Sequence, residues 1–471
     1  MILGEITINS VVFYISMDGF DDVHLWAGYI ISFGAPEYQL SQDYGGHCKL
    51  GFGSIELSPD LFSGDWPPPV SCAITIKYLD DDETDETQAE TVFDGTAYLA
   101  APGITEESVV YNLHGTTYDV DLLAESAVGY GSVTITLPRA FGTVTHVNPV
   151  RLVDVGGKPT YHKGYIASTT PGSNWSVFDD GINVDANVTD NADGTFSLSA
   201  GPVGEVTQTG DASQTTLSGI MSWACGASYL DLTYDSTYAR GTSPDVNFWA
   251  SSQEVLIEFL DGLASFFSHL FYIKSSTLYL VDMLIDNGTR TLTENDFMDV
   301  EYKYKTPVRI LESGWQTRAA VTETIGQYVK TTDNETFKAS AFPYGRKISV
   351  TPYHDAKADI DTALDNILTI LHKPYCPISI PVQGSLPVPG EAVSWTDTAP
   401  AQDLEISIRA RTISYDFDND EVKIIGEGAF VGAVPLSDYL AVVSGGDYPT
   451  PGVTAQERAI YAATCGLLGE L

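Results

Sequence analysis

The feature that most constrains the fold of this chain is a series of short segments in which apolar and polar residues alternate. Examples are residues 72–78 (CAITIKY), 132–137 (SVTITL) and 405–411 (EISIRAR). A period of two places successive side chains on opposite faces of a β-strand, so each segment predicts a strand with one buried face. Gly, Pro, Asn and Asp separate the segments, as they do between short strands joined by turns. The chain is therefore predicted to be mainly β.

Several turns are predicted from their residue types. Asp193 and Gly194, between residues 185–188 and 195–198, predict a tight hairpin because Gly readily adopts a positive φ, and Asn287-Gly288 predicts another. The acidic run 80–86 is predicted to be a solvated loop. Residues 416–421 (DFDNDE) are predicted to form a solvated turn, with a cation site as the alternative.

Two segments predict helices. Residues 251–254 (SSQE) have the pattern of a capping box. The helix after it is predicted from apolar residues at three-to-four spacing, namely Val255, Leu256, Phe259, Leu260, Leu263, Phe266, Phe267 and Leu270. A hairpin of residues 271–274 and 277–281 is predicted to follow. The second helix is predicted over 355–372, where Pro374 stops it.

The charge of the chain limits its partners. The 471 residues include 63 Asp+Glu and 23 Lys+Arg, a formal net charge of −40. Binding to nucleic acid depends on Lys and Arg displacing counterions, so specific DNA binding is not expected. No apolar run reaches the 18–20 or so residues of a membrane span, and the N-terminus lacks the pattern of a signal peptide. No membrane insertion is predicted, and synthesis in the host cytoplasm is expected.

Residue patterns typical of catalysis or metal binding are missing from the sequence. The five cysteines are far apart, the eight histidines form no HxxxH or HxH pair, and no nucleophile elbow or phosphate-binding loop occurs. Adjacent carboxylates such as Asp179 and Asp180 are expected by chance in so acidic a chain. We therefore predict no catalytic, cofactor-binding or metal-binding residue, no cofactor and no enzymatic activity.

Two roles are considered for the tryptophans, namely packing in a core and stacking on sugars at the surface. The loop of Trp66 and the three prolines after it is predicted to pack its Trp on the domain. Four others are predicted to lie in cores, with an exposed sugar-stacking surface as the alternative: Trp175, Trp223, Trp249 and Trp315. The alternative function is accordingly that of a virion-associated or secreted β-protein that binds or degrades glycans. An unrelated β-rich adhesin is a further alternative.

The order of these elements resembles that of the tail or baseplate hub proteins of tailed bacteriophages. The resemblance is carried by an N-terminal β region ending in 93–99 and 109–113, the helix–hairpin unit 251–281, the helix 355–372, and the segments 377–382, 389–395 and 416–427. It implies two β-barrel-like domains flanking an inserted α/β region, plus a C-terminal arm. The ranges expected are 1–125 (first barrel), 126–210 (β-rich insertion), 211–300 (α/β region), 301–432 (second barrel) and 433–471 (linker and docking arm).

The resemblance also implies a function and partners. It implies a structural ring in the virion tail, usually a homotrimer, that joins the tail tube to the tip or fibres and contacts tube, distal tail and fibre proteins. DNA passes through such a ring without specific binding, and a negative lumen repels DNA over about one Debye length, roughly 10 Å at 0.1 M salt. The rival explanation of the charge is a saline environment, in which acidic surfaces keep proteins soluble.

Overall fold

The computed structural model describes residues 1–432 except Ala35, Phe52, Asp65 and the ranges 81–82, 127–134, 240–242, 286–288, 294–295, 297–298, 301–307, 320–321, 332–345, 372–374 and 398–403. The predicted turn at 287–288 and the predicted arm at 433–471 lie outside the described residues. The elements are mostly strands, from β1 to β35, with the α-helices α1, α2 and α3 among them. The predicted mainly β fold with an α+β part is confirmed.

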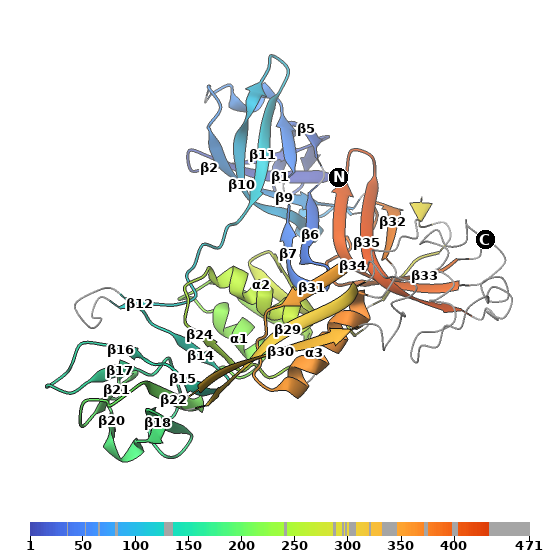
Figure 1. The fold of residues 1–471 in the computed structure, drawn as a ribbon. Coiled ribbons are helices and arrows are strands. Elements are labelled where there is room, and N and C mark those ends of the chain that lie inside the picture. The colour runs from blue at the N-terminus through green and yellow to red at the C-terminus, as the bar shows by residue number, and fades with distance from the viewer. Residues whose placement is uncertain are drawn as a thin grey trace.

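Strands from the first 115 residues form one curled nine-stranded sheet with the order β3-β4-β2-β1-β9-β10-β11-β8-β5 (Figure 1). The alternation predicted for residues 72–78 is confirmed, because Cys72, Ile74 and Ile76 of β9 are buried. The elements are β1 (Ile2–Ile8), β2 (Val11–Ser16), β3 (Phe20–Asp21), β4 (Leu25–Gly28), β5 (Ile30–Phe33), β8 (Ser54–Leu57), β9 (Ser71–Tyr78), β10 (Glu90–Ile104), β11 (Val109–Gly115) and the 3-10 turns η1 (Pro59–Phe62) and η2 (Glu86–Gln88).

A second sheet of eleven strands joins the two ends of the described chain. Strands β6 and β7 leave the N-terminal sheet, and their hairpin pairs with β34 on one side and with β25 on the other. The strands are β6 (Glu37–Gln42), β7 (Gly45–Leu50), β23 (Thr233–Tyr238), β25 (His269–Lys274), β26 (Thr277–Asp282), β27 (Thr289–Thr291), β28 (Asp299–Val300), β32 (Tyr375–Pro381), β33 (Ala392–Asp397), β34 (Leu404–Asp416) and β35 (Glu421–Gly432). The sheets thus do not follow the predicted ranges strictly, and the division into five domains stays a prediction.

The long hairpin of β34 and β35 contains the acidic turn predicted at 416–421. Both carboxylate oxygens of Asp416 accept hydrogen bonds from Asn419, from its backbone N (3.1 Å) and from its side-chain Nδ2 (2.8 Å). Asp420 has a φ of 53°, as a turn residue requires. Asp416 therefore closes the turn with its own side chain.

Residues 139–211 include two four-stranded sheets packed around their own apolar core, which contains Trp175 and Phe196. The hairpin predicted at Asp193 and Gly194 is present, but its loop spans residues 191–194 and its first strand is β20, because residues 185–187 form a 3-10 turn. The elements are β15 (Thr143–Val147), β16 (Val150–Arg151), β17 (Thr160–His162), β18 (Trp175–Asp179), β19 (Ile182–Asn183), η3 (Asp185–Asn187), β20 (Val188–Asp190), β21 (Thr195–Leu198) and β22 (Val206–Asp211).

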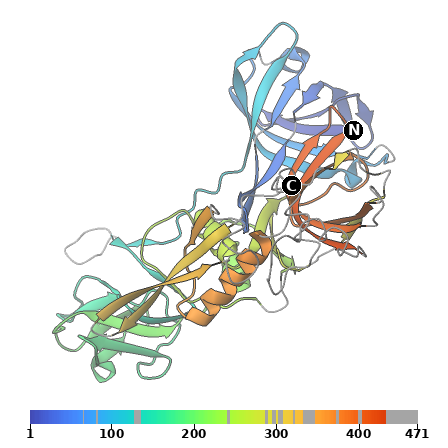
Figure 2. The ribbon, with the colours of Figure 1, turned by 45° about the vertical axis from the view of Figure 1, so that its right-hand side comes forward.

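Short strand pairs connect this insertion to the rest of the chain. They are β12 (Glu125–Ser126) with β13 (Ile135–Thr136), and β14 (Arg139–Phe141) with β24 (Phe248–Ala250). Helix α1 (Leu217–Ala224), which the sequence did not predict, begins nearby, where Thr216 Oγ1 accepts a hydrogen bond from Gly219 N (3.2 Å). Figure 2 shows the insertion at the opposite end of the molecule from the N-terminal sheet.

Helix α2 (Leu256–Phe266) has the predicted apolar face, but the predicted capping box is wrong. Its N-cap is Val255, and no side chain caps it. Residues 253–255 lie beside residues 121–123 instead, with Leu122 N donating to Glu254 O (3.0 Å). The helix also ends before Leu270, because the chain turns at Ser268 (φ 58°) into β25. The hairpin of β25 and β26 is as predicted, with Ser275 and Ser276 both at positive φ.

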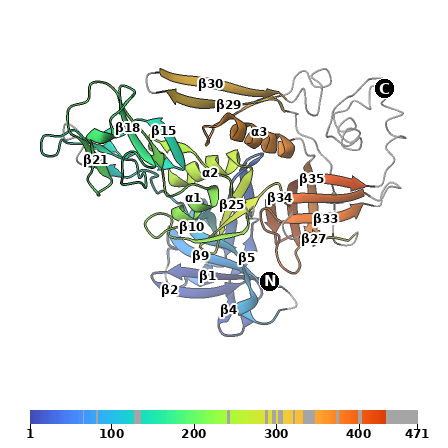
Figure 3. The same ribbon diagram turned by 90° about the horizontal axis from the view of Figure 1, so that it is seen from below.

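Helix α3 (Lys357–Leu371) confirms the second predicted helix, but it begins two residues after the predicted start, and residue 372 lies outside the described residues. It packs against β29 (Val308–Ala319) and β30 (Thr322–Thr331), which form a long hairpin with β31 (Arg346–Val350) at one edge. Figure 3 shows this three-stranded sheet lying across α3. Ile360, Leu364 and Ile367 of the helix are fully buried.

Candidate functional site

The carboxylates singled out in the sequence have structural partners. The two oxygens of Asp179 accept hydrogen bonds from Val203 N and Gly204 N, each 2.8 Å long, and so hold a loop of the insertion. Asp180 lies in the adjoining turn at a φ of 48°. Asp80, at the start of the predicted acidic loop, accepts from Gly384 N (2.5 Å). These three side chains do not come together as an acid–base pair.

Glu86 departs from the prediction that residues 80–86 are simply solvated. Its carboxylate accepts hydrogen bonds from Trp26 Nε1 (2.7 Å) and His24 N (3.1 Å), and it contacts His24 Nδ1 (2.5 Å). Burial acts to raise the pKa of Glu86, but these donors outweigh it and hold the pKa below its ordinary value. Glu86 therefore ties η2 to the β3–β4 hairpin as a carboxylate.

The tryptophans do not form one exposed surface. Trp175 is buried in the core of the insertion, whereas Trp223 and Trp249 are partly buried. The side chain of Trp315 lies outside the described part of the chain. Trp66 is 57% exposed, so the prediction that its loop packs the Trp is wrong. The prolines pack instead: Pro68 is buried, and Tyr111 OH donates to Pro69 O (2.8 Å).

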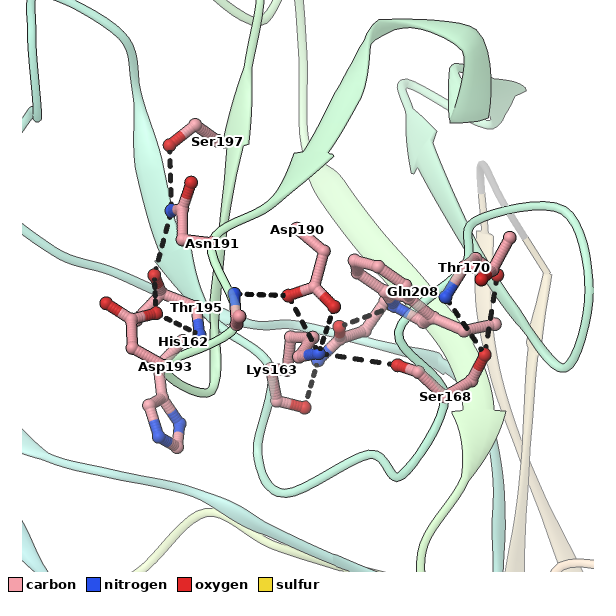
Figure 4. Close-up of polar contacts among 12 residues, drawn as sticks. His162, Lys163, Ser168, Thr170, Asp190, Asn191, Asp193, Thr195, Ser197 and Gln208 are labelled. Atoms are coloured by element: carbon pink, nitrogen blue, oxygen red, sulfur yellow. Dashed lines mark hydrogen bonds and ion pairs between the residues drawn. The ribbon is translucent and has the colours of Figure 1, made fainter.

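A buried polar cluster lies inside the insertion (Figure 4). Lys163 is 3% exposed, and its Nζ lies 3.0 Å from each carboxylate oxygen of Asp190 on β20. The same Nζ donates to Ser168 O (3.3 Å) and lies 4.9 Å from the ring centroid of Trp175. A buried ammonium ion requires such partners because water is excluded.

Neighbouring side chains complete this cluster. Gln208 Nε2 donates to Lys163 O (2.9 Å), and Gln208 Oε1 accepts from Trp175 Nε1 (3.2 Å). His162 Nδ1 accepts from Gly164 N (3.0 Å). Burial, and then the charge of Arg139, lower the pKa of His162 to about 4, against the opposite effect of Asp193. At neutral pH this His is uncharged.

The chemistry available to the cluster is limited. The Lys163 amine is engaged by a carboxylate, a carbonyl and an aromatic ring, so it is not a free base or nucleophile. His162 accepts a backbone hydrogen bond through Nδ1, which fixes its tautomer. The arrangement joins the loop after β17 to the β20–β21 hairpin and is structural. Sequence reasoning missed it, because no spacing signal links Lys163 to Asp190.

A second buried cation lies where the insertion meets α1. Arg139 on β14 is 6% exposed, and its Cζ lies 3.9 Å from the ring centroid of Tyr165 and 4.4 Å from that of Trp223. Its Nη2 donates to Tyr229 OH (3.1 Å). Cation–π contacts of this kind stabilise a buried guanidinium without a carboxylate. Arg139 thus bridges the insertion loop and the helix.

A cleft of about 740 Å³ lies between the β6–β7 hairpin, β10, the segment 115–119 and the β25–β26 turn. Its volume is within the range of ligand sites. Lys274 in its wall is paired with Glu90 (3.2 Å). Burial, and then Lys49, lower the pKa of His47 to about 3, so His47 is neutral and is not a general acid at neutral pH.

Metal and thiol chemistry have little support in the described residues. They contain no group of three or more His, Cys, Asp or Glu side chains that fits a metal ion. Four cysteines are buried and free: Cys48, Cys72, Cys225 and Cys376. Burial raises the pKa of Cys225 to about 11, so its thiol stays protonated. Cys465 lies outside the described residues. Among the described helices, none has the length and apolarity to cross a membrane.

No family model and no curated protein matches the sequence. Among solved structures, the chain is similar to a 43 kDa tail protein of prophage MuSo2 from Shewanella oneidensis, with 9% identity, 90% of this chain and 98% of that chain covered, and a TM-score of 0.41. It is similar to a tail protein from Neisseria meningitidis MC58, with 8% identity, coverage of 90% and 96%, and a TM-score of 0.41. A chain of a gene transfer agent virion is similar at 8% identity, coverage of 67% and 89%, and a TM-score of 0.43.

Proposed function

We propose that this chain is a non-enzymatic structural component of the tail tip or baseplate of a tailed bacteriophage, where it forms a hub-like ring between the tail tube and the tip or fibres. The observation that carries the proposal is the order of elements in the described chain. A curled N-terminal sheet is followed by an insertion, the α2–β25–β26 unit, α3 and the β32–β35 strands. This is the order in which the sequence resembles the hub proteins.

The second sheet supports a rigid ring subunit. Tyr38 of β6 pairs with Ile413 of β34, so the N-terminal and C-terminal strands share one hydrogen-bonded sheet. The Tyr38 ring also lies in an aromatic group with the rings of Tyr272 and Tyr415, at centroid distances of 6.1 and 6.4 Å. A continuous sheet transmits force between the ends of a subunit better than a flexible linker does. The division into domains with bounds 1–125, 126–210, 211–300, 301–432 and 433–471 belongs to this proposal.

The proposed partners are further copies of the chain, as a trimer, together with tube, distal tail and fibre proteins. Residues 433–471 are proposed to dock on a neighbouring subunit. The net charge of −40 supports passage of DNA without binding, because phosphates are repelled by carboxylates.

Cryo-electron microscopy of a phage particle that carries the chain tests the function. We expect density for the chain around the tail axis, between the tube and the tip, with carboxylates lining the lumen. A position away from the axis would overturn the hub proposal. A neutral or basic lumen in an axial ring would overturn the role of the charge while leaving the ring in place.

A further inference from the structure

Three segments of the N-terminal sheet contain no charged residue. Residues 66–76, 95–105 and 108–118 have no Asp, Glu, Lys or Arg, although these residues make up 18% of the chain. At that frequency, about six charged residues would be expected in the three segments together. The segments also bring four large apolar residues to the surface, namely Trp66, Val70, Tyr98 and Ile104.

The strand register places the three segments side by side. Tyr98 of β10 pairs with Ser71 of β9 on one side and with Asn112 of β11 on the other. Leu99 N donates to Val70 O (2.9 Å), which continues the pairing toward the Trp66 loop. Figure 1 shows the β10–β11 hairpin reaching past the other strands of its sheet, away from the insertion and the helices.

One side of these strands faces the core and the other faces solvent. Cys72, Ala97 and Leu113 are buried, whereas the residues that alternate with them are exposed or partly exposed. We define the uncharged face by its exposed residues, which are Trp66, Val70, Ser71, Ala73, Tyr98 and Asn112. Val70 is 76% exposed and Tyr98 is 45% exposed, so no described residue covers them fully.

Several other exposed apolar residues lie beside carboxylates. Val23 and Leu25 follow Asp21 and Asp22 in the β3–β4 hairpin. In the insertion, Val203 is 92% exposed, but Asp179 binds its backbone N. The uncharged face therefore differs from these patches because its own residues carry no charge. Carboxylates lie only at its edges in the strand register, where Asp94 pairs with Thr75 and Glu56 pairs with Val110.

We propose that the uncharged face is a docking surface for a second copy of this chain. Two chains of −40 repel each other wherever their carboxylates come within a Debye length, so their contact requires a surface without charge. The centres of protein interfaces are depleted of charge and enriched in Trp and Tyr, as this face is. A strongly basic partner would be drawn to the acidic remainder of the surface instead. This proposal rests on the proposed assembly of copies and identifies the surface that mediates it.

The test introduces a carboxylate on the face and measures mass in solution. Asn112→Asp is nearly isosteric at an exposed sheet position, and Tyr98→Asp is a second variant. Val203→Asp adds the same charge at an exposed apolar site elsewhere and is the matched control. Sedimentation velocity of the full chain over a concentration series should show an assembly for wild type and Val203→Asp. We expect at least a tenfold weaker association for both variants of the face.

Circular dichroism of each variant separates loss of association from loss of folding. Folded Asn112→Asp and Tyr98→Asp chains that assemble like wild type would overturn the proposal, and so would a wild-type chain that stays monomeric at all concentrations. If the variants of the face become monomers while the chain lies away from the tail axis in particles, the docking surface stands and the hub function fails. If the chain lies on the axis and the variants still assemble, the hub function stands and the docking surface fails.

Discussion

At the scale of single residues, the two buried cations of the insertion and its junction with α1 are held in different ways. Lys163 is paired with the carboxylate of Asp190, whereas Arg139 is stacked between the rings of Tyr165 and Trp223. Guanidinium is planar and less strongly hydrated than ammonium, so aromatic rings hold Arg139, whereas the Lys163 ammonium has the Asp190 carboxylate in addition to the Trp175 ring. Each cation fixes a different part of the insertion, one inside its sheets and one at its junction with α1.

The first prediction concerns the Lys163–Asp190 pair. Lys163→Met leaves the Asp190 carboxylate buried without its partner, which typically costs about 3–5 kcal/mol. Equilibrium unfolding in urea, followed by the fluorescence of the buried Trp175, should therefore show a much lower midpoint. The control is Asp154→Asn, which removes the partly exposed pair of Arg151 and Asp154 and should cost at most about 1 kcal/mol. Equal effects of the two changes would show that burial does not strengthen the inner pair.

The second prediction concerns pH and His162. Its pKa is lowered to about 4 in the fold, first by burial, whereas the unfolded chain has the ordinary value of about 6.5. The unfolded chain therefore binds the proton first as pH falls, so the contribution of His162 to stability is full above about pH 6.5 and is lost toward pH 4. His162→Gln keeps an acceptor for Gly164 N and removes the titration.

The measurement is the free energy of unfolding at several pH values across that window. The variant should lose less stability than wild type between about pH 6.5 and pH 4, by an amount on the order of 3 kcal/mol. Carboxylates that titrate in the same window affect both chains equally, so the difference isolates His162. Parallel curves for the two chains would contradict the lowered pKa.

At the scale of elements, the segment before α2 pairs with a distant segment instead of capping its helix. Gln253 Nε2 donates to Leu123 O (2.9 Å), and Gln253 Oε1 accepts from Leu123 N (3.0 Å). The third prediction is that Gln253→Ala lowers the free energy of unfolding by about 1–3 kcal/mol, because two backbone groups lose their partner. Ser251→Ala should change it by less than about 0.5 kcal/mol, although a capping box would predict the reverse order.

The β6–β7 hairpin approaches α2 closely at Gly46. Gly46 has a φ of +103°, and a Cβ there would overlap Asp261 Oδ1 and Ser265 Oγ. The fourth prediction is that Gly46→Ala destabilises the chain by about 3 kcal/mol, through backbone strain and overpacking together. Gly156 has a φ of +61° and open space around it. Gly156→Ala should therefore lower the free energy of unfolding by about 1 kcal/mol through backbone strain alone. Thermal unfolding of the two variants compares them, and similar losses would contradict the close approach.

Local signals predicted some elements well. The β25–β26 and β34–β35 hairpins and helix α3 depend on turn residues and apolar spacing within one segment, which the sequence shows directly. The pairing of β6 with β34 joins distant segments, and no local pattern carries that information. The same holds for the candidate sites. Asp190 ends β20 and its partner Lys163 follows β17, so the pair forms only when the insertion folds.

Two single residues differ from the prediction for their segment. The acidic run 80–86 is predicted to be a solvated loop, yet Glu86 binds Trp26 and contacts His24. Trp66 shows the opposite departure, because its neighbouring prolines pack and the Trp points outward. A single residue differs from the prediction for its segment when a neighbouring element provides a partner for it or fails to provide one. The spacing of residue types along the sequence does not show either case.

At the scale of the whole molecule, the net charge of −40 opposes any assembly of copies. The fifth prediction is that added salt strengthens association, because the Debye length falls from about 30 Å at 0.01 M to about 3 Å at 1 M. An interface built on opposite charges would weaken over the same range. Sedimentation velocity in NaCl measures the effect, and MgCl2 at equal ionic strength is the control. Equal strengthening by both salts means screening of repulsion, whereas a larger effect of Mg²⁺ means that bound cations neutralise the contact. Dissociation by NaCl would show that charged groups, and not an uncharged face, hold the copies together.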